Sequence, residues 1–185
     1  MQAELVARAQ HGDREAFSVL AYGANGRLYA TARLILHHPD LAEDAVQETL
    51  IAAWRDIRGL RDPDRLDAWL HRLLVRACHR HVRREQRRRA TELDLEPDLA
   101  ARQMDGARSV ADRDEIERAF RRLTIDQRTI LALVYYADLS LADVSASLGI
   151  PIGTAKSRLH RSLDALRAVL AAEDRAVPLT NGQIA

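Results

Sequence analysis

The segment of residues 139–166, with the sequence LSLADVSASLGIPIGTAKSRLHRSLDAL, restricts the possible folds of this chain more than any other feature. Ser140 is a favourable helix N-cap, and Asp143 stands where a capping box places its acid. Gly149 gives a flexible backbone at the turn, and Pro151 suits the start of a following helix. The spacing predicts two short helices joined by a tight turn.

The two predicted helices have the distribution of apolar and polar residues that a DNA-binding helix-turn-helix has. Their inward-facing apolar positions are Leu141, Val144 and Leu148, followed by Ile152, Ala155, Leu159 and Leu166. The other faces of the second helix carry Lys156, Ser157, His160 and Arg161. A basic second helix after a glycine turn is typical of helices that read the major groove. The alternative is a plain helical hairpin with a solvated basic face.

The rest of the chain favours an all-α fold. Hydrophobic residues make up 47% of the chain and recur at three- and four-residue spacing, whereas aromatic residues, glycine and proline are few. We expect helices over residues 3–20, 27–37, 40–57 and 68–89, with breaks at residues 12–13 and 23–26. Asp40 and Asp67 are the expected N-caps of the last two. In the second half we expect a helix with Ile116, Ala119, Phe120 and Leu123 inward, then one opened by a capping box at residues 124–127.

Charge is distributed very unevenly along the chain, although the net charge is only +1. Residues 40–48 are acidic, residues 71–89 are strongly basic and residues 92–117 are acidic again. The basic helix carries a ridge formed by Arg72, Arg76, Arg80, Arg83, Arg84, Arg87 and Arg88. Like charges on one face destabilise an isolated helix, so an anionic partner is the simplest explanation, with a merely solvated face as the alternative.

Residues 90–112 lose helical periodicity and include Pro97 and Gly106, which predicts a linker. The expected fold is therefore all-α, with two small helical domains joined by a flexible linker and a helix-turn-helix in the second. We place the first domain at residues 1–90, the linker at 91–112, the second domain at 113–172 and a flexible tail at 173–185.

Several classes of function lack their sequence signatures. The chain has no phosphate-binding loop, dinucleotide fingerprint, nucleophile elbow or pair of carboxylates placed for acid-base catalysis. Cys78, His79 and His81 are too few for a metal site. We therefore expect no enzyme activity, no cofactor and no metal. A single cysteine, no signal-peptide pattern and no long apolar run predict a cytoplasmic protein without membrane insertion.

Two separate segments resemble bacterial RNA polymerase sigma factors of the extracytoplasmic-function (ECF) type, within the sigma-70 family. In the C-terminal segment, residues 119–170, the most family-specific string is GTAKSRLHR at residues 153–161. In the N-terminal segment, residues 4–84, the strongest strings are GDREAF at 12–17, DLAEDAVQETLIAAWR at 40–55 and DAWL at 67–70. The segments follow the family's order and cover most of the chain.

The resemblance implies an initiation factor that binds core RNA polymerase and directs it to promoters through their −10 and −35 elements. The acidic helix would dock on the polymerase through Asp44, Gln47, Glu48 and Trp54. The loop of residues 58–67 would hold a flipped −10 base and the basic helix would follow the strand, through Arg61, Asp62, Asp64, Arg65, Trp69, Arg72, Arg76, Arg80 and Arg83. The recognition helix would read the −35 element through Thr154, Lys156, Ser157, Arg158, His160 and Arg161.

Two features of the family bear further on this chain. Arg76 and Arg80 stand where the family often has Asn and Asp, which predicts more contact with the DNA backbone. The resemblance also implies an anti-sigma protein as a partner.

Two other functions stay open at this point. The chain could be a stand-alone repressor or activator whose N-terminal half senses a ligand or dimerises, or an adaptor that binds polymerase without reading DNA. The acidic helix, the polar loop and the basic ridge argue against the stand-alone regulator, because a regulator needs none of them.

Overall fold

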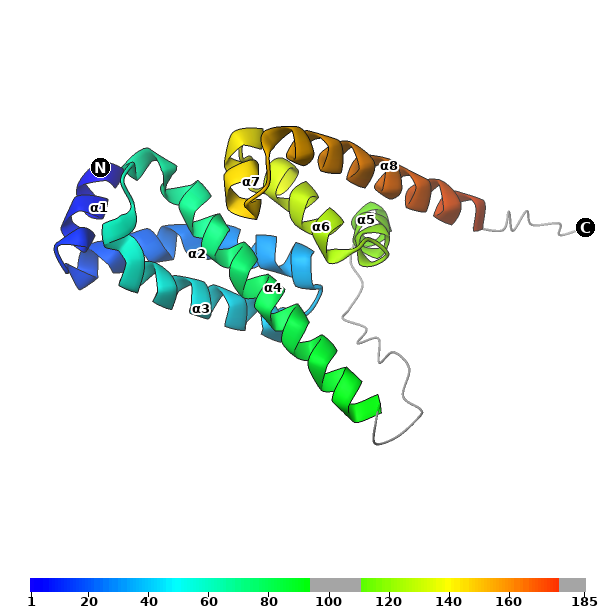
Figure 1. Ribbon diagram of the computed structural model, residues 1–185, viewed down its shortest axis with the longest axis horizontal. Coiled ribbons are helices and arrows are strands. Elements are labelled where there is room, and N and C mark those ends of the chain that lie inside the picture. Colours follow the sequence, from blue (N-terminus) through cyan, green and yellow to red (C-terminus); the bar gives the residue numbers. More distant parts are fainter. Residues whose placement is uncertain (94–110, 177–185) are drawn as a thin grey trace, which may run out of the picture.

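The computed structural model describes residues 1–93 and 111–176, and every regular element within them is helical (Figure 1). The all-α prediction is therefore confirmed. The helices are α1 (Gln2–Gln10), α2 (Arg14–Leu36), α3 (Pro39–Asp56), α4 (Leu66–Leu93), α5 (Ala111–Arg121), α6 (Ile125–Leu131), α7 (Leu141–Leu148) and α8 (Ile152–Ala176). Short turns of 3-10 helix lie at Ile57–Gly59 (η1) and Pro63–Arg65 (η2), and a π-helical turn follows α6 at Ala132–Tyr136 (η3). No described helix is both long enough and apolar enough to cross a membrane.

The N-terminal unit is built around α2, α3 and α4, with α1 packed against the start of α2 (Figure 1). The apolar stripe of α3 is buried as its spacing predicts, through Ala42, Val46, Thr49 and Ala53. It faces Leu28, Ala32 and Ile35 of α2 and Leu70, Leu74 and Ala77 of α4 in one continuous core. The packing of these three stripes fixes the directions in which the charged faces of α3 and α4 point.

The C-terminal unit contains the predicted helix-turn-helix. The capping box that opens α6 is present, because Thr124 Oγ1 accepts from the Gln127 backbone N–H and the Gln127 side chain accepts from the Thr124 N–H. Ser140 caps α7, and Gly149 ends it with φ at +65°, a conformation that costs glycine nothing. The core of the C-terminal unit is formed by Phe120, Leu123, Ile130, Leu131, Leu133 and Val144, with Leu159, Leu163 and Leu166 of α8 packed against them.

One expected break is absent. The sequence predicts a boundary at residues 23–26, but α2 runs without interruption through Gly23 and Gly26. Each glycine in a helix interior costs about 1 kcal/mol relative to alanine. The complete burial of Leu28 and the near-complete burial of Ala24 on the same helix offset that cost, so tertiary packing decides the outcome.

Two predicted N-caps are wrong. His38 caps α3, with its Nδ1 accepting from the Leu41 N–H at 3.4 Å, and Pro39 takes the first helical position. The chain enters α4 through η2, so Asp67 lies inside the first turn of α4 and does not cap it. In both cases an element begins before the aspartate that was expected to start it.

Two residues predicted to face inward are instead half exposed. Ile152 is the first residue of α8, ahead of the buried Ala155, and Ile116 lies one turn before the buried Ala119 and Phe120. At the far end, α8 continues to Ala176, so residues 173–176 of the expected tail are helical. The remainder of that tail, residues 177–185, lies outside the described residues. Most of the expected linker, residues 94–110, lies outside them as well.

The two units contact each other along α4 and α2. Helix α4 packs on α7, and α2 packs on α6 and η3 (Figure 1). Val75 of α4 is buried in the C-terminal core, whereas Ala132 of η3 is buried in the N-terminal core. The sequence gives no sign of this interface, because Val75 and Ala132 fit equally well into the cores of their own units.

Candidate nucleic-acid interface

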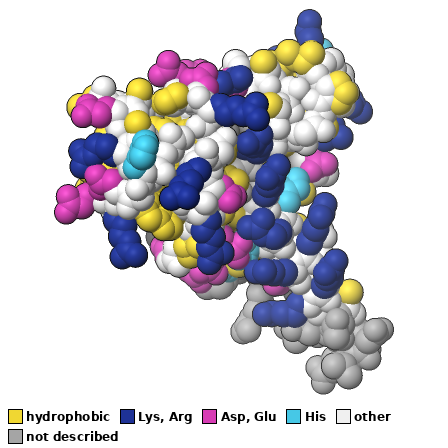
Figure 2. All heavy atoms as spheres, turned by 60° about the vertical axis from the view of Figure 1, so that its left-hand side comes forward, with side chains coloured by type: hydrophobic (Ala, Val, Ile, Leu, Met, Phe, Trp, Pro, Cys, Tyr) yellow, Lys and Arg dark blue, Asp and Glu magenta, His cyan; other side chains and the backbone are white. Residues whose placement is uncertain are grey.

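The basic ridge of α4 lies on the surface of the molecule. Figure 2 shows Lys and Arg side chains gathered along the far part of this helix. Arg76, Arg80 and Arg83 are exposed, whereas Arg72 is half-buried and its Nε is buried without a hydrogen-bond partner. Arg72 lies three residues before the buried Val75, on the side of α4 that meets the C-terminal unit. The ridge is therefore open to a phosphate backbone from Arg76 onward and partly covered at Arg72.

Glu48 joins the acidic helix to this ridge. Its carboxylate accepts from Arg80 at 2.9 Å and from Arg84 at 3.4 Å, and the ring of His81 lies 3.3 Å away. Burial alone would raise the pKa of Glu48, but the hydrogen bond from Arg80 and the neighbouring positive charges outweigh it and lower the pKa. A residue predicted to bind polymerase and one predicted to bind DNA thus bind each other in the free protein.

The loop between α3 and α4 combines buried apolar residues with exposed charged residues. Ile57, Leu60 and Leu66 are each less than a tenth exposed and anchor it in the N-terminal core. The side chains between them are exposed, namely Arg61, Asp62, Asp64 and Arg65. Asp62 caps η2 by accepting from the Asp64 N–H at 3.0 Å. The four predicted base-contacting loop residues are therefore exposed, although Arg65 pairs with Asp143 of α7.

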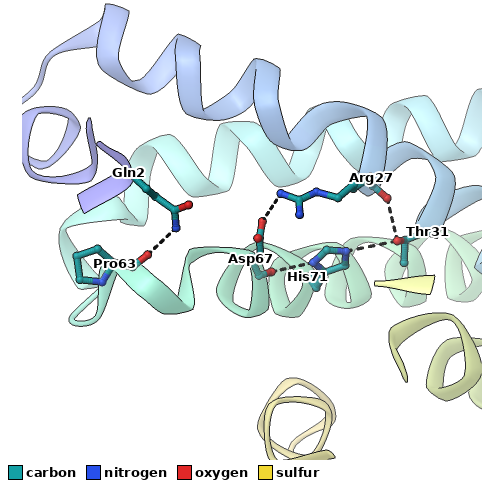
Figure 3. Close-up of polar contacts among 6 residues, drawn as sticks. All are labelled: Gln2, Arg27, Thr31, Pro63, Asp67 and His71. Atoms are coloured by element: carbon teal, nitrogen blue, oxygen red, sulfur yellow. Dashed lines mark hydrogen bonds and ion pairs between the residues drawn. The ribbon is translucent and has the colours of Figure 1, made fainter. Parts of the chain in front are cut away.

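Trp69 differs from the rest of the predicted −10 set. Trp69 is 9% exposed and packs in the N-terminal core. The neighbouring first turn of α4 is tied to α2 by polar contacts shown in Figure 3. Arg27 donates to the Asp67 carboxylate at 2.9 Å, and His71 contacts both the Asp67 carbonyl at 2.8 Å and the Thr31 hydroxyl at 3.4 Å.

The predicted polymerase-binding residues lie along the outer side of α3. Asp44 and Gln47 are exposed, and Gln47 lines a shallow groove of about 410 Å³ between α2 and α3. Trp54, in contrast, is half-buried against Phe17, with ring centroids 5.1 Å apart at 59°. Trp54 is thus only partly available to another protein.

The polar residues predicted to read DNA lie in the first three turns of the recognition helix α8, on its surface. Lys156, Ser157, His160 and Arg161 are exposed, and Thr154 and Arg158 are half-buried. Two of these side chains are already held by the helix, because Ser157 donates to the Thr154 carbonyl at 3.0 Å and Arg161 to the Ser157 carbonyl at 3.3 Å. Asp143 of α7 bonds to the Ser140 hydroxyl and pairs with Arg65 of the loop, so it does not complete a capping box.

Several polar residues with structural roles carried no sequence signal. Gln2 and Gln10 of α1 bond to loop carbonyls, and His79 of α4 lies 3.4 Å from the Thr129 hydroxyl of α6. Such pairs are 50 or more residues apart, and no local pattern reports them. The single cysteine, Cys78, is fully buried, and burial raises the pKa of its thiol to about 12. Within the described part of the chain, no three His, Cys, Asp or Glu side chains converge as metal ligands would.

Comparison with known families places both units. The sigma-70 region 2 family matches residues 23–88, and the sigma-70, region 4 family matches residues 113–166. The ECF RNA polymerase sigma factor SigM of Mycobacterium tuberculosis is 32% identical over 160 residues, which cover 86% of this chain and 80% of that protein. The RNA polymerase sigma-H factor of Pseudomonas aeruginosa is 29% identical over 174 residues, covering 88% of this chain and 90% of that protein.

Two solved structures share the arrangement. CnrH, solved in complex with the cytosolic domain of CnrY, matches 92% of this chain and 97% of its own, with 25% identity and a TM-score of 0.67. The sigma factor RpoE of Bartonella quintana, solved with the anti-sigma factor NepR, matches 83% of this chain and 93% of its own, with 29% identity and a TM-score of 0.64. The chain therefore belongs to the extracytoplasmic-function sigma factors of the sigma-70 family, the initiation factors that direct RNA polymerase to promoters.

Proposed function

We propose that different helices of this sigma factor bind the polymerase, the −10 element and the −35 element. The N-terminal domain, residues 1–90, docks on core polymerase through Asp44, Gln47, Glu48 and Trp54 of α3 and captures the −10 element with the loop and α4. The C-terminal domain, residues 113–172, reads the −35 element with α8, and residues 91–112 connect the two. The observation that carries this proposal is the outward acidic face of α3 beside the outward basic face of α4, held in that order by one shared core.

The loop and α4 have the chemistry of a site for single-stranded DNA. Capture of an unstacked base needs a pocket or polar edge to hold it and positive charge for the flanking phosphates. In this chain Arg61, Asp62, Asp64 and Arg65 supply exposed donors and acceptors, and Arg76 and Arg83 supply positive charge further along. Arg72 joins them once the C-terminal unit moves away, and Trp69 supports the loop from below.

The recognition helix α8 has the chemistry of a major-groove reader. Lys156, Arg158 and Arg161 can donate to guanine edges, and Thr154, Ser157 and His160 can bond to phosphates or bases. We place the action of this chain in the cytoplasm, with the polymerase, as a transcription factor and not as an enzyme.

We further propose that an anti-sigma protein holds this factor inactive. Its support is the similarity to CnrH and to the Bartonella RpoE, which were solved with CnrY and with the anti-sigma factor NepR. A partner of this kind would have to compete with polymerase or stabilise the contact between the two units.

Run-off transcription tests the proposal. Purified core polymerase is supplied with this protein and with the DNA upstream of its own gene. We expect a defined transcript that requires the protein, together with weak binding of the isolated protein to the same duplex. The absence of a transcript combined with tight binding by the protein alone would refute the proposal and indicate a stand-alone regulator.

A further inference from the structure

Helix α1 is hydrogen-bonded to the loop that precedes α4. Gln10 Nε2 donates to the carbonyl of Leu60 at 2.7 Å and to the carbonyl of Ile57 at 3.1 Å. In return, Arg58 Nε donates to the Gln10 carbonyl at 3.1 Å. Both ends of η1 are thus tied to one residue that lies about 50 positions earlier in the chain.

A second contact holds the other half of the loop. Gln2 Nε2 donates to the carbonyl of Pro63 at 2.9 Å, as Figure 3 shows, with the amide of Gln2 pointing from α1 toward the loop. Gln2 and Gln10 are separated by eight helical steps, or about 12 Å along the axis of α1. The two amides therefore brace the loop at two separated points, on either side of Arg61 and Asp62.

Helix α1 is itself fixed, so it can act as a brace. Val6 is fully buried and Ala9 is 2% exposed in the N-terminal core. Arg8 pairs with Asp13 at 2.7 Å, and Asp13 caps α2 by accepting from the Ala16 N–H at 3.0 Å. Because α1 is locked to the start of α2, the position of its side-chain amides is set by the core and not by the loop.

We infer that Gln10, assisted by Gln2, is a positioning residue for −10 recognition, which fixes the loop backbone so that its exposed side chains meet the base in a preset geometry. The inference rests on the proposed role of the loop in holding a −10 base. A loop that is ordered before binding avoids the entropy cost of ordering it on the DNA, and its donors discriminate among bases more sharply. The region 2 family match begins at residue 23, so Gln2 and Gln10 lie outside the matched segment, whereas the loop that they bind lies inside it.

The test uses the full-length protein and three substitutions. Gln10→Met keeps the length of the side chain and removes the donor, and Gln10→Lys restores a donor at the same place. Glu4→Met places a methionine at an exposed position of the same helix, α1, and serves as the control. Thermal unfolding of all four proteins verifies that each is folded at the assay temperature.

The first readout is hydrogen exchange of the backbone amides of residues 57–66. We expect exchange about tenfold faster in Gln10→Met, equivalent to about 1.4 kcal/mol of local stability, and wild-type rates in Glu4→Met. We expect Gln10→Lys to fall near the wild type. Wild-type exchange in Gln10→Met would overturn the inference.

The second readout is open-complex formation with core polymerase on promoters carrying single-base changes. We expect Gln10→Met to lose several-fold discrimination at the −10 element and to keep full discrimination at the −35 element. Faster exchange with unchanged −10 discrimination would overturn the inference, since the brace would then be structural only. If the wild type itself did not discriminate at either element, the proposed function would fail, and this inference with it.

Discussion

Protonation of His37 should weaken the contact between the two units of this sigma factor. His37 ends α2 with φ at +53°, and the Nε2 of its ring is buried without a hydrogen-bond partner. Burial, and next the positive charge of Arg128 in α6, lower the pKa of His37 from 6.5 to about 4. Arg121 of α5 and Arg33 of α2 act in the same direction, and the backbone of Phe120 opposes them. All charged groups that face the ring are thus positive, and two of the three belong to the C-terminal unit.

The direction of the pH effect follows from proton binding. Between pH values of about 4 and 6.5 the unfolded chain protonates His37 and the folded protein does not, so the folded state is fully stable above this window and loses stability as the pH falls through it. Lowering the pH from about 7.5 to about 5 across this shift corresponds to about 2 kcal/mol by linkage. Part of the ring is exposed, so solvent screening reduces the expected loss to about 1 kcal/mol.

Urea denaturation at the two pH values measures this loss, with His37→Asn as the variant. Asparagine tolerates the left-handed conformation that His37 adopts, so the cap is kept while the titrating ring is removed. We expect the wild type to lose about 1 kcal/mol more than His37→Asn on acidification. His71 and His79, whose pKa values are also lowered by burial, contribute equally to both proteins and cancel.

His11→Asn is the matched control, because His11 is an exposed histidine that ends α1. This variant should follow the wild-type pH dependence. An identical pH dependence in His37→Asn and the wild type would refute the reasoning, since the folded state would then have no preference for a neutral ring at residue 37.

Three further predictions concern DNA binding. Arg76→Ala should weaken open-complex formation and reduce the slope of log affinity against log salt by about 0.7 to 0.9, and an unaltered slope would contradict a phosphate contact. Arg158→Ala with Arg161→Ala should reduce discrimination at the −35 element by about 1–3 kcal/mol for each base-contacting residue, measured on a panel of promoter variants. Joining Arg65→Cys and Asp143→Cys with a short bifunctional maleimide should abolish run-off transcription relative to the same double variant left unlinked, which also lacks the Arg65 side chain and is therefore the reference; transcription equal to that reference would show that the closed contact does not limit initiation.

Local sequence signals predicted most of the elements of this fold. The stripe from Ala42 to Ala53 and the caps at Ser140 and Thr124 follow from spacing within a few residues, and each is present in the structure. Gly23 and Gly26 misled the prediction because glycine reports a backbone cost and says nothing of the packing that offsets it. The cap at His38 was missed because histidine is not among the residues favoured at helix N-caps.

The candidate site was predictable where its residues are exposed and charged, and unpredictable where it depends on distant pairs. The ridge around Arg76 is visible in the sequence, because its charge repeats with the helix. The pairing of Arg80 with Glu48 is not visible, since it joins side chains 32 positions apart in helices whose rotation is set by the core. The hydrogen bond from Gln10 to the loop is not visible either. Its acceptor is a backbone carbonyl, and every residue type carries one.

The closed contact between the units conflicts with simultaneous reading of both promoter elements. The −10 and −35 elements are separated by roughly 25 base pairs, or about 85 Å of duplex at 3.4 Å per step. In the structure, however, Arg65 of the loop proposed to hold a −10 base pairs with Asp143 of α7, the helix that precedes the proposed −35 reading helix α8. The two units must therefore separate before both can engage one promoter. The interface contains the Arg65–Asp143 ion pair, a 3.4 Å contact at His79 and the buried side chains of Val75 and Ala132, so polymerase docking has to supply the free energy that separates these contacts.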